Sequence, residues 1–176
     1  MKKLINLIIT INMIFPIAIA AQNSGDYIQD NNINKFIGNW LWKSGNSSLL
    51  LTLEKAERVK LVSTVNVQLD ILYGYHKYIK NDSVVENSLE DSDTGYDAKK
   101  HTLLGSSDKK NSNLLTGSFI HTSKNKSIRF EIEYIDSTHI KLIKLENYEG
   151  VRVDVPGKPP YDSTISLPSN IILTKQ

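Results

Sequence analysis

Apolar and charged residues alternate strictly along part of the chain, with the period of a β-strand. The segment 128–134 reads IRFEIEY, so every second residue is apolar. Such alternation directs one set of side chains into a core and the other into solvent. Asp136 and Ser137 supply a turn, and the segment 139–145, HIKLIKL, alternates again. The two segments together predict an antiparallel hairpin.

Further short apolar runs indicate that most of the chain is extended. They lie at 36–42, 49–53, 61–69, 70–79, 84–85, 114–121, 151–155 and 171–174, and turn-forming residues separate several of them at 44–46, 80–83 and 156–160. Only the segment 27–35 has room for a short helix or helical turn. The pattern predicts an all-β antiparallel barrel of roughly eight to ten strands, with a two-sheet β-sandwich as the alternative.

The segment FIGNWLW at 36–42 favours the barrel. Gly38, Trp40 and Trp42 lie on one face of a strand because side chains alternate along it. A helical turn followed by Gly-x-Trp resembles the start of the lipocalin and calycin barrels. This resemblance implies that Gly38 and Trp40 form a structural plug at one end of an eight-stranded barrel. Lys175 stands where that pattern has an arginine in the last strand.

A second resemblance covers nearly the whole chain. Four segments carry it: FIGNW at 36–40, GYHKY at 74–78, VRV at 151–153 and LPSNIILTK at 167–175. Their order is similar to a family of short exported Bacteroidota proteins with no assigned function. The resemblance therefore implies a fold and a location, and it implies no activity.

The N-terminal residues have the pattern of a signal peptide. Lys2 and Lys3 precede a mainly apolar stretch, and Ala18-Ile19-Ala20 matches a signal-peptidase site. We expect residues 1–21 to be a signal peptide and residues 22–176 a single barrel domain, periplasmic or secreted. The chain has no cysteine, so it is expected not to be a lipoprotein or to form disulfides. No second long apolar run follows this stretch, so no transmembrane segment is expected.

The charge balance argues against nucleic-acid binding. The chain has 21 basic and 19 acidic residues, which gives a net charge of +2. Lys2 and Lys3 account for this excess, and all acidic residues follow residue 21. The expected mature domain is therefore neutral and lacks the basic stripe that attracts phosphate backbones.

The polar segment 86–113 is predicted to be a long mobile excursion between strands. It contains Asp93-Thr94-Gly95, the core of an aspartic-protease motif, but the apolar strand that should precede such a motif is missing. The alternating carboxylates of Asp91, Asp93 and Asp97 leave calcium binding open, although the loop lacks the glycine and the closing glutamate of an EF-hand.

No other motif indicates an enzyme or a cofactor. The histidines at 76, 101, 121 and 139 lack the spacing of a metal site, and the chain has no nucleophile elbow, P-loop or dinucleotide fingerprint. We therefore expect no catalytic residues, no metal and no cofactor, and the question of an enzyme stays open.

The aromatic segment 73–78 leads to two hypotheses about function. The first is a carrier that holds a small apolar or aromatic ligand in its lumen, lined by Trp42, Tyr73, Tyr75, His76 and Tyr78. The second is a filled barrel that binds another envelope or secreted protein. Since a barrel of about eight strands can be filled by side chains or hold one small ligand, the sequence leaves both open.

Overall fold

The computed structural model describes residues 26–60, 67–149 and 161–176. The strand expected at 151–155 and most of the one expected at 61–69 lie outside these residues. The described residues contain ten strands and four short 3₁₀ helices. None of the helices in these ranges is long and apolar enough to cross a membrane.

The strands differ in length from two to thirteen residues. In chain order they are β1 (Tyr27–Ile28), β2 (Gly38–Ser44), β3 (Ser47–Val59), β4 (Gln68–Lys80), β5 (Ser83–Asn87), β6 (Leu103–Ser107), β7 (Leu114–His121), β8 (Lys126–Asp136), β9 (His139–Asn147) and β10 (Ile171–Lys175). The 3₁₀ helices are η1 (Asn31–Phe36), η2 (Leu89–Asp91), η3 (Tyr96–Ala98) and η4 (Thr122–Lys124).

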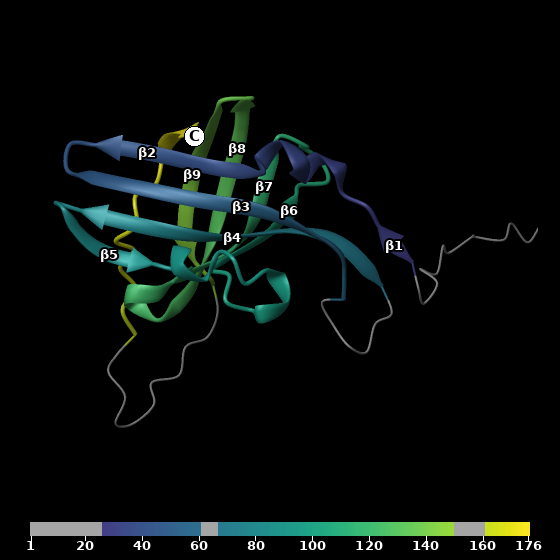
Figure 1. The fold of residues 1–176 in the computed structure, drawn as a ribbon, viewed down its shortest axis with the longest axis horizontal. Coiled ribbons are helices and arrows are strands. Elements are labelled where there is room, and N and C mark those ends of the chain that lie inside the picture. Colours follow the sequence, from purple (N-terminus) through teal and green to yellow (C-terminus); the bar gives the residue numbers. More distant parts are fainter. Residues whose placement is uncertain (1–25, 61–66, 150–160) are drawn as a thin grey trace, which may run out of the picture.

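Eight of the strands form a closed antiparallel barrel. Sequential neighbours pair from β2 to β4 and from β6 to β10. Pairing of β10 with β2, and of β4 with β6, closes the ring. Strands β2 to β4 cross β7 to β9 at a steep angle (Figure 1). The predicted all-β barrel, the helical turn before its first strand and the β8–β9 hairpin are confirmed.

The strand that follows β4 is divided into two parts. Since β3 occupies one edge of β4, both β5 and β6 pair with the other edge. The Ser88 N–H donates to the His76 carbonyl and the Thr102 N–H donates to the Gly74 carbonyl, so the pairing resumes after an insertion at residues 89–101. The excursion predicted at 86–113 is therefore shorter, because β6 lies within it.

Large apolar side chains fill the barrel interior. Direct strand partners share a face, and the inward partners include Trp40 with Leu51 and Phe119 with Ile128. These four side chains are completely buried, and they belong to one contiguous core cluster. The described hollows, lined by residues such as Thr116, Leu41, Ile28 and Glu57, open on the outer surface.

Two glycines permit close packing beside the Phe130 ring of β8. Gly105, Gly117 and Phe130 are neighbours in one row across β6, β7 and β8. A Cβ on Gly105 would lie 2.8 Å from Phe130 Cζ, and one on Gly117 would overlap the Leu104 carbonyl oxygen. The strands therefore approach more closely here than any larger residue permits.

The barrel is closed differently at its two ends. At the Trp40 end, where β2 begins, η1 places the completely buried Ile33 and Phe36 across the opening. The indole N–H of Trp40 donates to the Phe36 carbonyl at 2.7 Å. At the His121 end, where β7 ends, a strap formed by residues 161–167 places Leu167 in the core. One end is therefore closed by aromatic packing and the other by a strap.

Candidate functional site

The residues expected to line a lumen lie on opposite sides of the barrel wall. His76 and Tyr78 are strand partners of Leu51 and Leu49, so they face inward, and the partly buried Trp42 packs against the same core. Tyr73 and Tyr75 occupy the outward face of β4. The structure therefore brings together Trp42, His76 and Tyr78 and separates them from the other two tyrosines.

Tyr73 and Tyr75 hold the insertion against the outside of the barrel. The Tyr73 ring packs edge-on against Tyr96 and His101, and these two rings stack on each other at 5.1 Å. The Tyr73 hydroxyl donates to Glu54 at 2.5 Å. Burial, together with this hydrogen bond, raises the pKa of Tyr73 well above its ordinary value. Strand β4 is thus buried on both faces.

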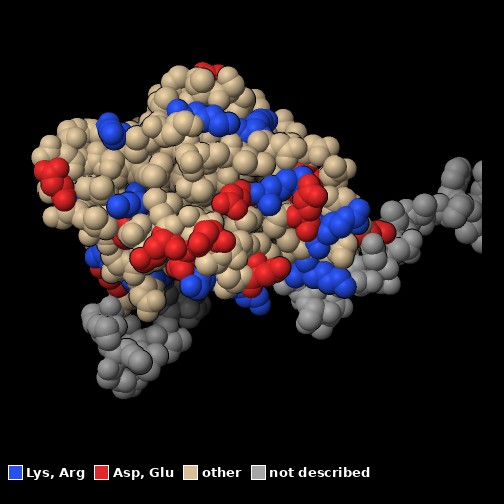
Figure 2. Space-filling view, viewed as in Figure 1, with Lys and Arg blue, Asp and Glu red and all other residues tan. Residues whose placement is uncertain are grey.

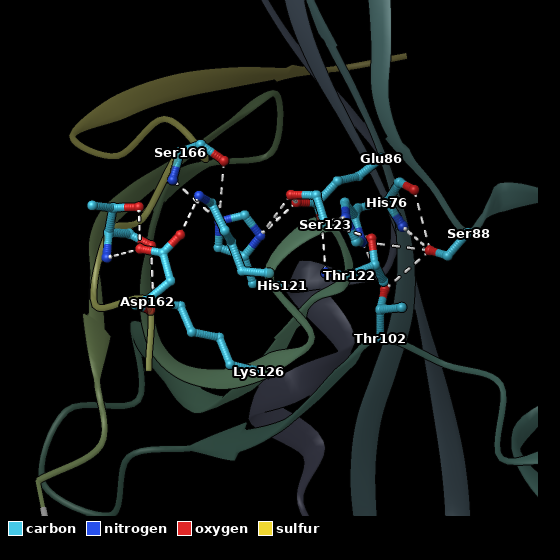
Figure 3. Close-up of polar contacts among 12 residues, drawn as sticks. His76, Glu86, Ser88, Thr102, His121, Thr122, Ser123, Lys126, Asp162 and Ser166 are labelled. Carbon is cyan, nitrogen blue, oxygen red and sulfur yellow. Dashed lines mark hydrogen bonds and ion pairs between the residues drawn. The ribbon is translucent and has the colours of Figure 1, made fainter. Parts of the chain in front are cut away.

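A buried polar network lies at the His121 end, centred on the carboxylate of Glu86 (Figure 3). Its Oε2 accepts hydrogen bonds from His76 Nε2 at 2.8 Å and from the Thr122 N–H at 3.0 Å and hydroxyl at 2.9 Å. Its Oε1 accepts from the Ser123 hydroxyl at 2.6 Å and from His121 Nδ1 at 2.5 Å. Glu86 therefore joins β5 to β4, β7 and η4.

These hydrogen bonds determine the charge on Glu86. Burial alone would raise the pKa of its carboxyl, but the hydrogen bonds from His76 and Ser123 and the nearby imidazoles lower it from 4.5 to about 2. Glu86 is consequently an anion at neutral pH, although its side chain is completely shielded from solvent.

The proton on His121 can be assigned from its partners. Nε2 lies 3.1 Å from the backbone nitrogen of Ser166, which can only donate, so Nε2 is the acceptor and carries no proton. Nδ1 then carries the proton that is donated to Glu86. His121 is therefore neutral. Burial lowers the pKa of His121 below 6.5, and it outweighs the opposite effect of Glu86.

His76 connects the network to both halves of the divided strand. Its Nδ1 lies 2.8 Å from the Thr102 hydroxyl, which lies 3.0 Å from the Ser88 hydroxyl. The His76 backbone N–H also donates to the Ser88 hydroxyl at 2.8 Å. Ser88 and Thr102 flank the insertion, so these contacts hold the two halves together at the point where the strand is interrupted.

Lys126 holds the strap on the side away from Glu86. Its buried ammonium donates to Asn147 Oδ1 at 2.9 Å and to the carbonyls of Asp162 and Thr164, both at 2.8 Å. Three acceptors match the three protons of an ammonium group. Together with the bond between Ser166 and His121, they anchor the strap to the ends of β7 and β8.

The contacts among Ser166, His121 and Glu86 have the order of a nucleophile, a base and an orienting carboxylate. The Ser166 hydroxyl lies 3.2 Å from His121 Nε2. The single lone pair of Nε2, however, already accepts the backbone N–H of Ser166, so the imidazole is not free to take a proton from the hydroxyl. The arrangement favours anchoring of the strap over nucleophilic catalysis.

The carboxylates of the insertion do not converge on a cation site. Asp91 forms an ion pair with Lys100 at 2.6 Å. Among the described residues, no three histidine, aspartate or glutamate side chains are placed to hold a metal ion. The calcium loop considered for Asp91, Asp93 and Asp97 therefore receives no support from the geometry.

The outer face of β2 and β3 carries a hollow of about 410 Å³ next to η2. Leu41, Leu50 and Leu89 form its apolar part, and the remaining residues are polar and uncharged: Asn39, Thr52, Ser92 and Gln176. Figure 2 shows a broad area of the same face with few charges, above a group of acidic side chains. The hollow thus combines an apolar floor with an uncharged polar rim.

Only one member of the polar network, His76, is among the residues predicted from the sequence. His76 was selected as part of an aromatic run. Glu86 lay at the start of the polar segment, and Ser166 lay before the final strand without any motif. His121 ends an apolar run. Its partners Glu86 and Ser166 lie 35 and 45 residues away in the sequence, and no local pattern connects them to it.

Taken together, the fold and the network define a small antiparallel β-barrel protein with a filled interior. The chain belongs to a family of unknown function, DUF6705, whose sequence pattern matches residues 1–176. Comparison with curated proteins and with solved structures gave no match.

Proposed function

We propose that this protein is an exported binding module that contacts another protein through the outer face of β2 and β3. The filled interior is the observation that carries this proposal: Trp40, Leu51 and Phe119 are completely buried within the barrel. A lumen occupied by such side chains has little room for a ligand, so recognition is assigned to the outer surface. The N-terminal pattern of residues 1–21 supports export.

The hollow between Leu41, Leu50 and Leu89 indicates the chemistry of the partner. Its apolar floor suits an aliphatic or aromatic side chain, and its polar rim suits backbone groups next to that side chain. Lys77 is the direct strand partner of Leu50, and Lys43 lies two residues beyond Leu41, so both lysines belong to this outer face. Neither lysine has a carboxylate partner among the described residues.

The partner is therefore a protein segment with an apolar anchor, whose acidic residues lie at Lys43 and Lys77 and not at the acidic side chains of η2. Ile172, which is 52% exposed, extends the apolar surface onto β10, because it shares a face with Thr174, the strand partner of Leu41. The carrier hypothesis stays a prediction, and the packing of the interior weighs against it.

Site-specific photo-crosslinking in intact producing cells tests this proposal. A photoreactive residue at position 50 is expected to give a discrete adduct. One at the exposed Ile135 is expected to give none, because β8 lies four strands from β3 around the barrel. Charge reversal by Lys43→Glu with Lys77→Glu should reduce the adduct at position 50 at least fivefold. Equal adducts at positions 50 and 135, or an adduct insensitive to the charge reversal, would refute the proposal.

A further inference from the structure

We propose that the contact between His121 and the strap is an acid-released latch that opens the His121 end of the barrel. At neutral pH, Nε2 of His121 accepts the backbone N–H of Ser166 at 3.1 Å and lies 3.2 Å from its hydroxyl. This contact joins the end of β7 to a segment 45 residues further along the chain.

Protonation reverses the hydrogen-bonding role of Nε2. The protonated nitrogen becomes a donor and faces the Ser166 backbone N–H, which is also a donor, so that bond is replaced by repulsion, and the Ser166 hydroxyl at 3.2 Å is left as the acceptor. Nδ1 remains bound to Glu86 and prevents the ring from turning away. The strap therefore has to move. Its upstream part stays attached because Lys126 binds the carbonyls of Asp162 and Thr164.

Some charged groups around His121 raise its pKa and others lower it. Glu86 on β5 stabilises the imidazolium, while Lys126 on β8 and Lys124 in η4 oppose it. Lys124 is itself paired with Asp162 on the strap, and His76 on β4 reaches the same carboxylate from the other side. Burial of the ring outweighs the attraction of Glu86 and keeps the pKa of His121 below its ordinary value, so the latch stays closed at neutral pH and opens only on acidification below 6.5.

Release of the strap uncovers the barrel core. Leu167, the residue after Ser166, is 4% exposed and belongs to the core cluster, and Ile165 packs against that cluster. Displacement of these side chains leaves an apolar opening at the His121 end. The interior, closed at neutral pH, thereby becomes accessible to small apolar molecules in acidic surroundings. This behaviour is independent of the outer face proposed for binding a partner.

Hydrogen exchange of the Ser166 amide, measured by NMR across pH 7.5 to 4.5, tests the latch. Once the intrinsic acid dependence of exchange is removed, protection of this amide should fall by up to about tenfold per pH unit as the pH drops from 6.5 toward the lowered pKa of His121 in the closed state, because opening takes up one proton in that window. Amides in the middle of β3, which exchange only on global unfolding, should stay much more protected than the Ser166 amide over the same range. In the same samples, the ¹⁵N signal of His121 Nε2 should change from the unprotonated to the protonated form at the same midpoint.

Two glutamine variants separate the latch from other effects of acid. His121→Gln keeps an oxygen that can accept the Ser166 N–H and cannot be protonated, so protection of Ser166 should become independent of pH. His139→Gln alters an exposed histidine at the Trp40 end and should behave as the parent does. If His121→Gln does not fold, the parent still decides the matter: an Nε2 that stays unprotonated until global unfolding, or protection of Ser166 that is lost only with the β3 amides, would overturn the proposal.

Discussion

The ammonium of Lys175 lies 5.1 Å from the centre of the Trp40 ring, and Lys175 is the direct partner of Trp40 where β10 meets β2. The last strand thus places a cation on the ring of the first barrel strand. Gly38 permits this approach, because a Cβ at that position would lie 2.9 Å from Lys175 Cε. The residue expected to replace the arginine of the lipocalin pattern is the one that contacts the ring.

Replacement of Trp40 by alanine should destabilise the fold by about 3–5 kcal/mol, the usual cost of deleting a large buried aromatic side chain. The indole is completely buried and its N–H is bonded to the Phe36 carbonyl. Urea unfolding measures the effect. Lys175→Met, which retains the aliphatic stem, should cost only about 0.5–1 kcal/mol, as expected for a partly exposed cation–π contact. A loss below about 1 kcal/mol for Trp40→Ala would show that the ring is not part of the core.

Gly117→Ala should destabilise the barrel by at least about 1–3 kcal/mol, the range for overpacking, although the added group is a single methyl. The new Cβ would overlap the Leu104 carbonyl oxygen on the neighbouring strand. Ser106→Ala, at an exposed position of the neighbouring strand β6, is the control and should be nearly neutral. Equal stability of the two variants in thermal unfolding would contradict the close approach of β6 and β7.

Much of the fold follows from periodicity, and the exceptions have identifiable causes. The alternation in β8 and β9 predicted their hairpin because one face of each strand meets the core and the other meets solvent. Strand β4 lacks this alternation, since the insertion buries its outer face through Tyr73 and Tyr75. Strand β6, LLGSS, is short and contains a glycine and two serines, so it resembled a loop.

The polar network was hidden for a different reason. Glu86, His121 and Ser166 are brought together only when the barrel closes, and no local spacing connects them. Their residue types are compatible with loops and strand ends alike, so the burial that gives them their role is a property of the tertiary structure alone.

Glu86→Gln should destabilise the fold although it preserves the size of the side chain. Glu86 accepts hydrogen bonds from five donors, and a glutamine would turn an NH₂ group toward several of them. Each buried donor left unpaired costs about 1–3 kcal/mol. Glu90→Gln, an exposed change in η2, should be nearly neutral. Similar urea midpoints for the two variants would show that the network does not support the fold.

Stability should fall in two stages as the pH decreases. His121 has a folded pKa below 6.5, so the folded state disfavours its proton, and stability is lost as the pH falls from 6.5 toward the folded pKa. Glu86 has a folded pKa of about 2 against an ordinary value of 4.5, so its contribution is present above 4.5 and is lost toward 2. Each group changes stability by at most about 1.4 kcal/mol per pH unit within its window.

Urea unfolding at intervals between pH 8 and pH 3 measures both stages. In His121→Gln the decrease below 6.5 should become shallower, while the decrease below 4.5 remains. The Glu86→Gln variant should lack most of the lower stage. A profile of the parent that is flat from pH 7 to pH 4 would contradict the assignment of His121 as a buried neutral imidazole.

Methyl NMR on leucine-labelled protein at pH 7.5 tests the central claim, which is that the interior is filled and that binding belongs to the outer face. Leu49, Leu51 and Leu53 report on the interior, whereas Leu41 and Leu50 report on the outer face. Decanoate, an anilinonaphthalene sulfonate and haemin should leave the interior methyl signals unchanged at millimolar or saturating concentration. A peptide from the segment crosslinked at position 50 should shift the outer methyl signals alone. Saturable shifts of the interior methyl signals with any of the three small molecules would show an accessible lumen and contradict the account.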